Sequence, residues 1–389
     1  MKKAARLVAS IAATAAIALA AMPARAICVP VEERAESTTV HHSLDLGAGG
    51  FGISLGNSAR WSGLRINLVD RDVERITGIN VTLWKPKNNG AAVMRGIQLG
   101  LLAPSAGVLD GISVGGLAVI AERRMIGISI GGLAAICDGD QLGIALGGFA
   151  DITDGDAKGL RLGGLATICD GSTLGINAGG LATICDGDQS GVSFGGLAAI
   201  CDGSQRGLSI GGLAVIANGS RSGIGAGGLA TICDGNTRGI NVGGLATICD
   251  GRQSGFAIAG LANIADGGLR GLGAAGLANV VDGGVTGLCI SGLGNVVGGV
   301  SRGISIAGVT IRGEDIIGGA AAGAYIRADR MSGLSIAPVN YFDEYQVGIS
   351  IGIVNYTRSL KGIQLGIINI VRNNRSPFKA LPILNVHLE

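Results

Sequence analysis

The sequence contains few aromatic residues, prolines and histidines. Aromatic side chains make up 3% of the 389 residues, and there are only 7 prolines and 3 histidines. A barrel embedded in lipid carries girdles of aromatic side chains, a serine triad needs a histidine base, and zinc sites commonly use histidine. The shortage of these residues argues against all three classes.

Glycine, in contrast, is abundant, with 72 of 389 residues. Collagen is excluded because the glycines do not recur at every third residue. Disorder is excluded because 47% of the residues are hydrophobic, far more than a solvated chain carries. This composition favours a fold in which backbone packs closely against backbone many times.

The first 26 residues resemble a secretory signal peptide. They combine a basic start, an apolar stretch and a small-x-small cleavage pattern: Lys2, Lys3 and Arg6, then Leu7 to Ala21, then Ala24-Arg25-Ala26. The bulky Ile27 before Cys28 does not suit a lipoprotein signal. We therefore expect an exported chain that begins near Ile27 and resides in the periplasm, in the outer membrane or at the cell surface.

Removal of this segment would leave the chain nearly neutral. The whole sequence has 30 basic and 28 acidic residues, and four of the basic ones lie in residues 1–26, so 26 basic residues remain against 28 acidic ones. Nucleic acid requires a concentrated basic face, which this balance does not suggest. No small-molecule substrate or cofactor is evident. Envelope components or another surface are the expected partners, and membrane association stays open.

A 16-residue repeat runs through the middle of the chain. It is well shown by Gly175-Ile-Asn-Ala-Gly-Gly-Leu-Ala-Thr-Ile-Cys-Asp-Gly187, in which we number Gly175 as position 1. Thirteen units follow one another without an insertion or deletion, beginning at Gly111, Gly127, Gly143, Gly159, Gly175, Gly191, Gly207, Gly223, Gly239, Gly255, Gly271, Gly287 and Gly303.

Looser copies flank this regular array, with spacings of 11 to 18 residues. They begin near Gly52, Gly63, Gly78 and Gly96, and again near Gly319, Gly333, Gly348 and Gly362. The predicted organisation is a signal peptide at 1–26, an N-terminal segment at 27–50, degenerate repeats or a cap at 51–110, the regular array at 111–318, and degenerate repeats with a C-terminal cap at 319–389.

Each unit is predicted to be extended chain. Its apolar residues alternate locally, as in Ile176 and Ala178, and glycine costs about 1 kcal/mol relative to alanine inside a helix. The Asp-Gly at positions 12 and 13 indicates a turn, and the Gly-Gly at positions 5 and 6 indicates a bend.

Two architectures fit such a unit. In a β-solenoid each unit is one coil, stacked about 4.8 Å from the next. In a closed antiparallel outer-membrane β-barrel, which would act as a pore or scaffold, each unit is one strand and one turn. The constant repeat length suits stacked coils, and both faces of the unit look largely apolar, whereas a water-filled barrel needs one polar face. We predict an all-β solenoid of 16-residue coils, with the barrel as the alternative.

The larger aromatic residues suggest how the ends of such a stack are covered. They lie outside the array, at Trp61, Trp84, Tyr325, Tyr341, Phe342, Tyr345, Tyr356 and Phe378. We therefore expect aromatic-richer capping regions on both sides of the repeats.

The repeats are similar to those of the bacterial glycine-rich "surface repeat-containing" protein family. The similarity rests on Gly-Ile-x-x-Gly-Gly-Leu-Ala-x-Ile units, on Gly348-Ile-Ser-Ile-Gly-Ile-Val-Asn355 and Gly362-Ile-Gln-Leu-Gly-Ile-Ile-Asn369, and on the closing Pro377-Phe-Lys-Ala-Leu-Pro-Ile-Leu-Asn385. It covers roughly residues 50–389. The resemblance implies export and an envelope location but no chemistry. The cysteines at position 11 depart from the family's pattern.

Two motifs look catalytic but arise from the repeat. Gly-x-Ser-x-Gly, typical of a hydrolase nucleophile elbow, occurs at Ser113, Ser129, Ser193, Ser209 and Ser350. The same slot holds Ala145, Arg161 or Asn177 in other units, so it is a variable polar position. Gly-x-Gly-x-x-Gly occurs at Gly223/Gly225/Gly228 and Gly271/Gly273/Gly276, where no helix is expected to follow.

Three columns of the repeat remain as candidates for chemistry or structure. Position 11 holds Cys137, Cys169, Cys185, Cys201, Cys233 and Cys249, which we interpret as buried filler, with disulfides between coils as the alternative. Position 12 holds mostly acidic residues: Glu122, Asp138, Asp154, Asp170, Asp186, Asp202, Asp234, Asp250, Asp266 and Asp282. We interpret these as turn formers rather than as calcium ligands. Position 9 holds Asn263, Asn279 and Asn295 in consecutive units, which predicts a stacked amide ladder.

No catalytic, cofactor-binding or metal-ligating residue is predicted. The sequence indicates an exported structural or adhesive repeat protein of the bacterial cell envelope, not an enzyme.

Overall fold

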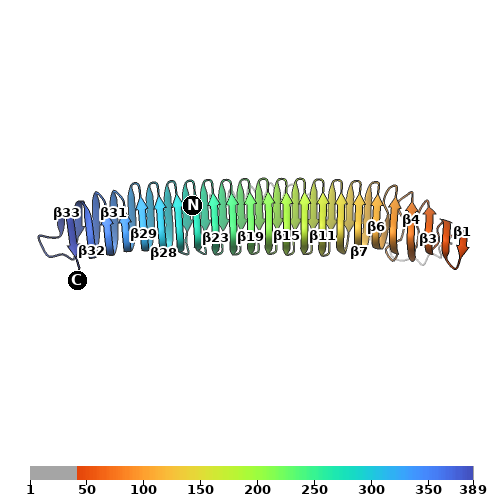
Figure 1. Cartoon of the computed structure of the whole chain (residues 1–389), viewed down its shortest axis with the longest axis horizontal. Helices are drawn as coiled ribbons and strands as arrows, with labels where there is room; N and C mark the ends of the chain where they lie inside the picture. Colours follow the sequence, from red (N-terminus) through yellow and green to blue (C-terminus); the bar gives the residue numbers. More distant parts are fainter. Residues whose placement is uncertain (1–41, 389) are drawn as a thin grey trace. The chain divides into compact units, whose positions relative to one another are not determined.

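A computed structural model describes residues 42–388, and this part of the chain is built entirely from β-strands and turns (Figure 1). Its 33 strands belong to one continuous hydrogen-bonded sheet that winds into a rod. Within these residues no helix is long and apolar enough to span a membrane. The expected signal peptide at 1–26, together with Cys28 and His41, lies outside the described residues.

The strands have the following bounds in chain order: β1 Ser43–Ala48, β2 Phe51–Gly56, β3 Arg60–Asn67, β4 Arg75–Thr82, β5 Val93–Gly100, β6 Ser105–Gly115, β7 Ala118–Gly131, β8 Ala134–Cys137, β9 Asp140–Gly147, β10 Ala150–Thr153, β11 Ala157–Gly163, β12 Ala166–Cys169, β13 Thr173–Gly179, β14 Ala182–Cys185, β15 Gln189–Gly195, β16 Ala198–Cys201, β17 Gln205–Gly211, β18 Ala214–Ala217, β19 Arg221–Gly227, β20 Ala230–Cys233, β21 Thr237–Gly243, β22 Ala246–Cys249, β23 Gln253–Ala259, β24 Ala262–Ala265, β25 Leu269–Ala275, β26 Ala278–Val281, β27 Val285–Ser291, β28 Gly294–Ala307, β29 Thr310–Ala322, β30 Tyr325–Ile336, β31 Val339–Ile351, β32 Val354–Val371 and β33 Ala380–His387.

Successive repeats pair in parallel and in register. Strand β13 pairs with β11 on one side and with β15 on the other, so that Gly175 lies between Gly159 and Gly191. The short strands do the same: β14 pairs in parallel with β12 and with β16. This arrangement confirms the predicted solenoid. The alternative antiparallel barrel is wrong, because each unit returns to stack on the previous one instead of reversing beside it.

Antiparallel strands occur only at the two ends of the described rod. Strand β1 pairs antiparallel with β2, and β33 pairs antiparallel with β32. The degenerate repeats on either side of the array carry aromatic residues both inside and outside the coil. Trp61 and Phe342 are buried, whereas Trp84 and Phe378 are exposed.

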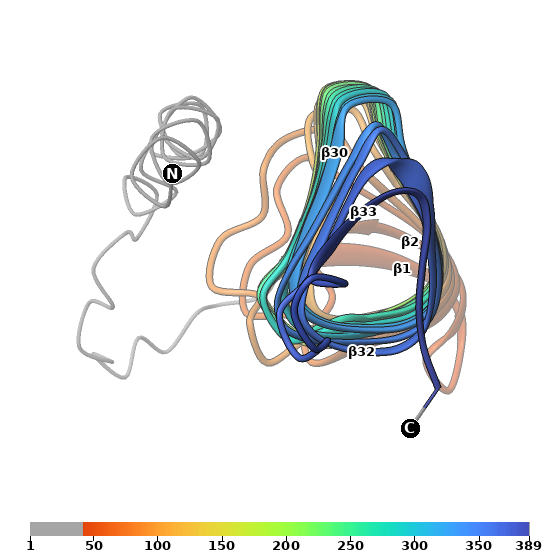
Figure 2. The same ribbon diagram turned by 90° about the vertical axis from the view of Figure 1, so that its left-hand side faces the viewer.

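Each coil has a triangular outline when the rod is viewed from its end (Figure 2). One strand runs from position 15 of one unit to position 5 of the next, and a shorter one runs from position 8 to position 11. The bend between these strands lies at Gly180-Leu181, one residue later than the predicted Gly179-Gly180, because Gly179 is the last residue of β13. The predicted turn at Asp186-Gly187 lies between the short strand and the next long one. In the C-terminal flank the glycine that continues the position-1 column is Gly318 rather than the expected Gly319, because Gly318 pairs with Gly303.

The inside of the coil is polar or small, and much of the outside is apolar. In the unit that begins at Gly175, the buried side chains are Asn177, Thr183, Cys185 and Gln189. Ile176 is 48% exposed, and the neighbouring Leu174 is 55% exposed. The expectation that both faces are apolar is therefore wrong. Alternation along the strands turns the mostly small or polar residues of this unit inward, and other coils bury larger side chains in the same columns, such as Met125, Arg161 and Leu269.

Glycine at position 1 is required by the close approach of successive coils. Throughout the regular array these glycines have φ between 101° and 131°, which L residues rarely adopt. A methyl group at any of them would lie 2.0–2.2 Å from the carbonyl oxygen of the equivalent glycine one coil earlier. Backbone geometry and packing therefore exclude a side chain at this position.

We predict that Gly207→Ala destabilises the rod by at least about 2 kcal/mol, the scale of a strained backbone combined with a steric clash. The added methyl group would lie 2.1 Å from the oxygen of Gly191, at a φ of +110°. The matched control is Gly319→Ala, where the nearest atom to the added carbon is 3.9 Å away. Thermal and urea unfolding measure both variants, and equal losses would contradict this account of the glycine column.

Candidate functional site

The serines of the Gly-x-Ser-x-Gly motifs are buried inside the coil. Ser113, Ser129, Ser193, Ser209 and Ser350 are at most 2% exposed. The Ser113 hydroxyl donates to Gln98 Oε1 at 3.0 Å, and Ser350 shares a 2.7 Å hydrogen bond with Ser335. These serines are therefore interior column residues and are not presented to solvent as nucleophiles.

The Gly-x-Gly-x-x-Gly motifs likewise have no helix after them. Gly223 and Gly225 lie in β19, and Gly271 and Gly273 lie in β25; each strand leads into a bend and then another strand. A dinucleotide site of the type that this motif marks needs a helix N-terminus after the strand. The motifs follow from the repeat, as the sequence predicted.

The position-11 cysteines form a buried column of free thiols. Several of their Sγ atoms lie near carbonyl oxygens of the adjacent turn; Cys185, for example, donates to Gly171 at 3.4 Å and to Gly187 at 3.3 Å. Burial raises the pKa of Cys137 to about 11, whereas hydrogen bonds with neighbouring cysteines of the column lower the pKa of Cys185 and of Cys233. Cysteine reacts as the thiolate, a form that burial disfavours at Cys137 near neutral pH. The interpretation of the column as buried filler agrees with these contacts.

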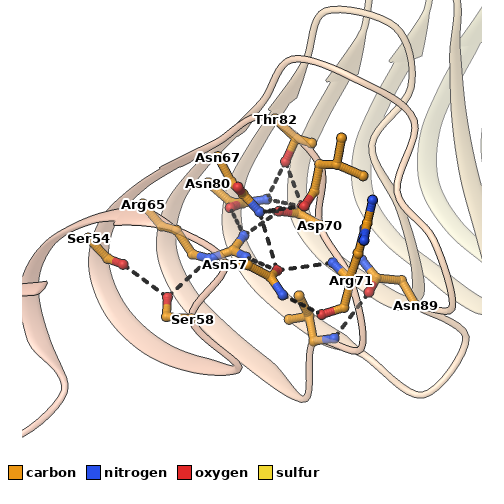
Figure 3. A network of polar contacts seen from close by, with 12 residues as sticks. Ser54, Asn57, Ser58, Arg65, Asn67, Asp70, Arg71, Asn80, Thr82 and Asn89 are labelled. Atoms are coloured by element: carbon orange, nitrogen blue, oxygen red, sulfur yellow. Dashed lines mark hydrogen bonds and ion pairs between the residues drawn. The ribbon is translucent and has the colours of Figure 1, made fainter. Parts of the chain in front are cut away.

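A buried polar network that the sequence analysis did not identify occupies the N-terminal coils (Figure 3). Its centre is Asp70, which follows β3 and is buried beside Arg65. Arg65 Nη1 lies 2.5 Å from Asp70 Oδ1. Asn67, Asn80 and Thr82 also donate to this carboxylate, at 2.9, 3.1 and 2.5 Å.

These contacts make the Arg65–Asp70 network a structural feature. An ion pair that is removed from water stabilises a fold only when hydrogen bonds satisfy its remaining donors and acceptors, and here both carboxylate oxygens are shared among several donors. The signal that could have located it is the run of polar residues at alternate positions in β3 and β4.

A second buried ion pair lies within the regular array. Arg161 Nε donates to Asp151 Oδ2 at 2.6 Å, and Gln141 donates to the other carboxylate oxygen at 3.0 Å. Burial raises the pKa of Asp151, and the adjacent Arg161 opposes that rise. The three side chains occupy inward positions 3, 9 and 15 of the repeat, so they meet at the centre of the coil.

The predicted asparagine ladder is present. Thr247 donates to Asn263 Oδ1 at 2.6 Å, Asn263 donates to Asn279 Oδ1 at 3.3 Å, and Asn279 donates to Asn295 Oδ1 at 2.8 Å. All three asparagines are fully buried. A second ladder in the C-terminal flank joins Asn340, Asn355 and Asn369, with both links at 2.8 Å.

We predict that Asn279→Leu destabilises the protein by about 1–3 kcal/mol, because the carbonyl of Ile290 and the amides of Asn263 and Asn295 lose a buried partner. The matched control is Asn279→Thr, because other units carry threonine at position 9. This variant should lose less free energy of unfolding than Asn279→Leu. The midpoint of chemical unfolding is the measurement. Wild-type stability in the leucine variant would contradict the role of the ladder.

The position-12 aspartates form an exposed column at the turns. The pKa of Asp186 is raised by its partial burial and then by Asp170 and Asp202 in the adjacent turns. Asn218 interrupts the column, and its amide donates to Asp202 Oδ1 at 2.8 Å. At position 14 a carboxylate links adjacent turns, because Asp156 accepts a hydrogen bond from the backbone amide of Ser172 in the next coil at 2.9 Å. No group of three or more potential ligands that could hold a metal occurs in residues 42–388.

We predict that Asp186→Asn raises the unfolding midpoint at pH 7 by removing like-charge repulsion, an effect below about 1 kcal/mol between adjacent strands. A raised pKa in the folded state means that the ionised carboxyl opposes folding. The gain is therefore complete at neutral pH and disappears as the pH falls well below the ordinary aspartate value of about 3.9.

The reciprocal variant, Asn218→Asp, serves as the control for this column. It should lower the midpoint at pH 7, because it replaces the hydrogen bond to Asp202 with a repulsive contact. Thermal unfolding between acidic and neutral pH measures both variants. A pH-independent effect of Asp186→Asn would contradict the electrostatic explanation.

The largest uniform feature of the outer surface is apolar. Positions 2, 4, 7, 8 and 10 of the twelve units that begin at Gly111 to Gly287 contain only Ala, Gly, Val, Leu, Ile and Phe. We call this surface the apolar ridge. Its crest is the position-7 column, whose side chains are 36–53% exposed: Leu117, Leu133, Phe149, Leu165, Leu181, Leu197, Leu213, Leu229, Leu245, Leu261, Leu277 and Leu293.

No family model matches the chain, and no match to a curated protein or to a solved structure was found.

Proposed function

We propose that this protein is an exported structural or adhesive component of the bacterial cell envelope and has no enzymatic activity. The observation that carries the proposal is the division of side chains between the two sides of the coil. Polar groups that could perform chemistry are turned inward and bonded to one another, as in the Arg161–Asp151 pair and the asparagine ladders. The outside presents apolar side chains at positions 2, 4, 7, 8 and 10 of coil after coil.

A surface of this kind suits repeated contact better than turnover. Many identical weak contacts along one rigid body add up to a strong attachment without any specialised pocket. The signal-peptide features of residues 1–26 and the resemblance of the repeats to the bacterial surface-repeat family support an envelope location. Membrane association belongs to the same proposal.

Export can be tested by expressing the full chain in a bacterium, separating cytoplasm from envelope, and sequencing the N-terminus of the recovered protein. We expect a processed chain that begins at Ile27 and is recovered with the envelope. The control places Leu7→Arg and Val8→Arg in the apolar stretch and should keep the chain unprocessed in the cytoplasm. Recovery of the unaltered protein as a full-length cytoplasmic chain would contradict the proposal.

A further inference from the structure

The apolar ridge is much larger than the apolar patches of ordinary monomers. Twelve coils at about 4.8 Å each give a length of roughly 55 Å, and its two sides of four extended residues are each about 13 Å wide. The ridge therefore covers on the order of 1,400 Å², whereas the largest patch on a typical monomer is about 300–600 Å². No polar side chain interrupts it over these coils.

The shape of the ridge limits what can cover it. The bend at positions 6 and 7 separates the side that carries positions 2 and 4 from the side that carries positions 8 and 10, so the surface is convex (Figure 2). A second copy of this rigid rod could cover one side, about 700 Å², and would leave the other in water. Acyl chains are fluid and can surround both sides at once.

The residues beside the ridge also suit a lipid surface. Position 16, separated from the first ridge position only by a glycine, holds exposed arginines in every second coil from Arg206 onward: Arg206, Arg238, Arg270 and Arg302. Arginine can keep its aliphatic stem on an apolar surface while its guanidinium remains in the polar headgroup region. Repetition every two coils places these groups about 10 Å apart along one edge.

The residues that follow the ridge at its C-terminal end also suit a lipid surface. Beyond Gly303 the side that carries positions 8 and 10 becomes aromatic and cationic, and arginines lie over tyrosine rings at 5.3 to 5.6 Å in the pairs Arg312–Tyr325, Arg327–Tyr341 and Arg372–Tyr356. Tyrosine is enriched at membrane–water interfaces. On the other side, the position-12 aspartates follow the ridge directly and limit how far that side can enter lipid.

We propose that the rod binds lengthwise to a lipid layer, with the apolar ridge among the acyl chains and the position-16 arginines at the phosphates. This inference rests on the proposed envelope function, for which it names the partner. The polar turns at positions 12 to 14, which include the aspartate column, then face the water.

Flotation with lipid vesicles tests the inference directly. The processed full chain is mixed with vesicles of phosphatidylcholine and phosphatidylglycerol and centrifuged through a density gradient. We expect the protein to rise with the vesicles and the triple variant Leu213→Glu, Leu229→Glu, Leu245→Glu to lose at least tenfold in bound fraction. Each leucine is 45–46% exposed, so the substitutions leave the interior columns untouched.

The matched control places the same three charges, with the same 16-residue spacing, on the polar turn: Ser204→Glu, Ser220→Glu, Asn236→Glu. This variant should float like the unaltered protein, and circular dichroism should show that both variants remain folded. Equal flotation of the leucine variant would overturn the inference. So would assembly of the unaltered chain into larger species that ignore added vesicles, since that result assigns the ridge to other copies.

The two proposals can fail separately. Envelope recovery without vesicle binding would overturn the lipid partner and leave the envelope function standing. Vesicle binding by a chain that is never exported would overturn the envelope function and leave the binding of the ridge to lipid standing.

Discussion

In-register parallel hydrogen bonding between successive coils is the constraint on which the rest of this structure depends. It forces each residue to lie directly beside its counterpart 16 residues away, as the pairing of Gly175 with both Gly159 and Gly191 shows. Each position of the repeat must therefore meet the same packing requirement in every coil. The position-1 glycines meet this demand because only hydrogen atoms fit between their backbone and the carbonyl oxygen of the preceding coil.

The narrow coil has an unusual consequence for stability. In the regular array the interior is filled mainly by Thr, Asn, Gln, Cys, Ala and Ser side chains, with few larger aliphatic ones such as Met125 and Leu269. Burial of aliphatic groups therefore contributes less there than in an ordinary globular core. Hydrogen bonds between backbones of successive coils, and side-chain ladders such as Asn263–Asn279–Asn295, contribute a larger share of the stability. Most of the larger aliphatic side chains of the array lie on the outside, so the apolar ridge and the mostly polar inside follow from the same alternation along the strands.

Charged side chains have different partners inside and outside the coil. Inside, Arg65 with Asp70 and Arg161 with Asp151 occur as hydrogen-bonded ion pairs, whereas the buried Arg221 donates to Gln205 and to backbone carbonyls instead of to a carboxylate. Hydrogen bonds are needed in each case because a buried charge without them would be very costly. Outside, the pKa values of Asp154 and Asp186 are raised by partial burial and then by the aspartates of the neighbouring turns. The stack tolerates this repulsion because water screens exposed charges and the many backbone hydrogen bonds between coils are far stronger in sum.

The repeat length, its freedom from insertions and its glycine content were sufficient to predict an all-β stack of 16-residue coils, and the run of asparagines at position 9 was sufficient to predict the amide ladder. These properties depend only on periodicity, which the sequence displays. The inward or outward direction of each column depends on where the chain bends. The bend at Gly180-Leu181 interrupts the alternation, so that neither of the consecutive residues Leu181 and Ala182 is buried, whereas Thr183 is. That bend exists only once the coils are stacked, so the polar interior, the Arg65–Asp70 network and the apolar ridge were decided by the tertiary structure.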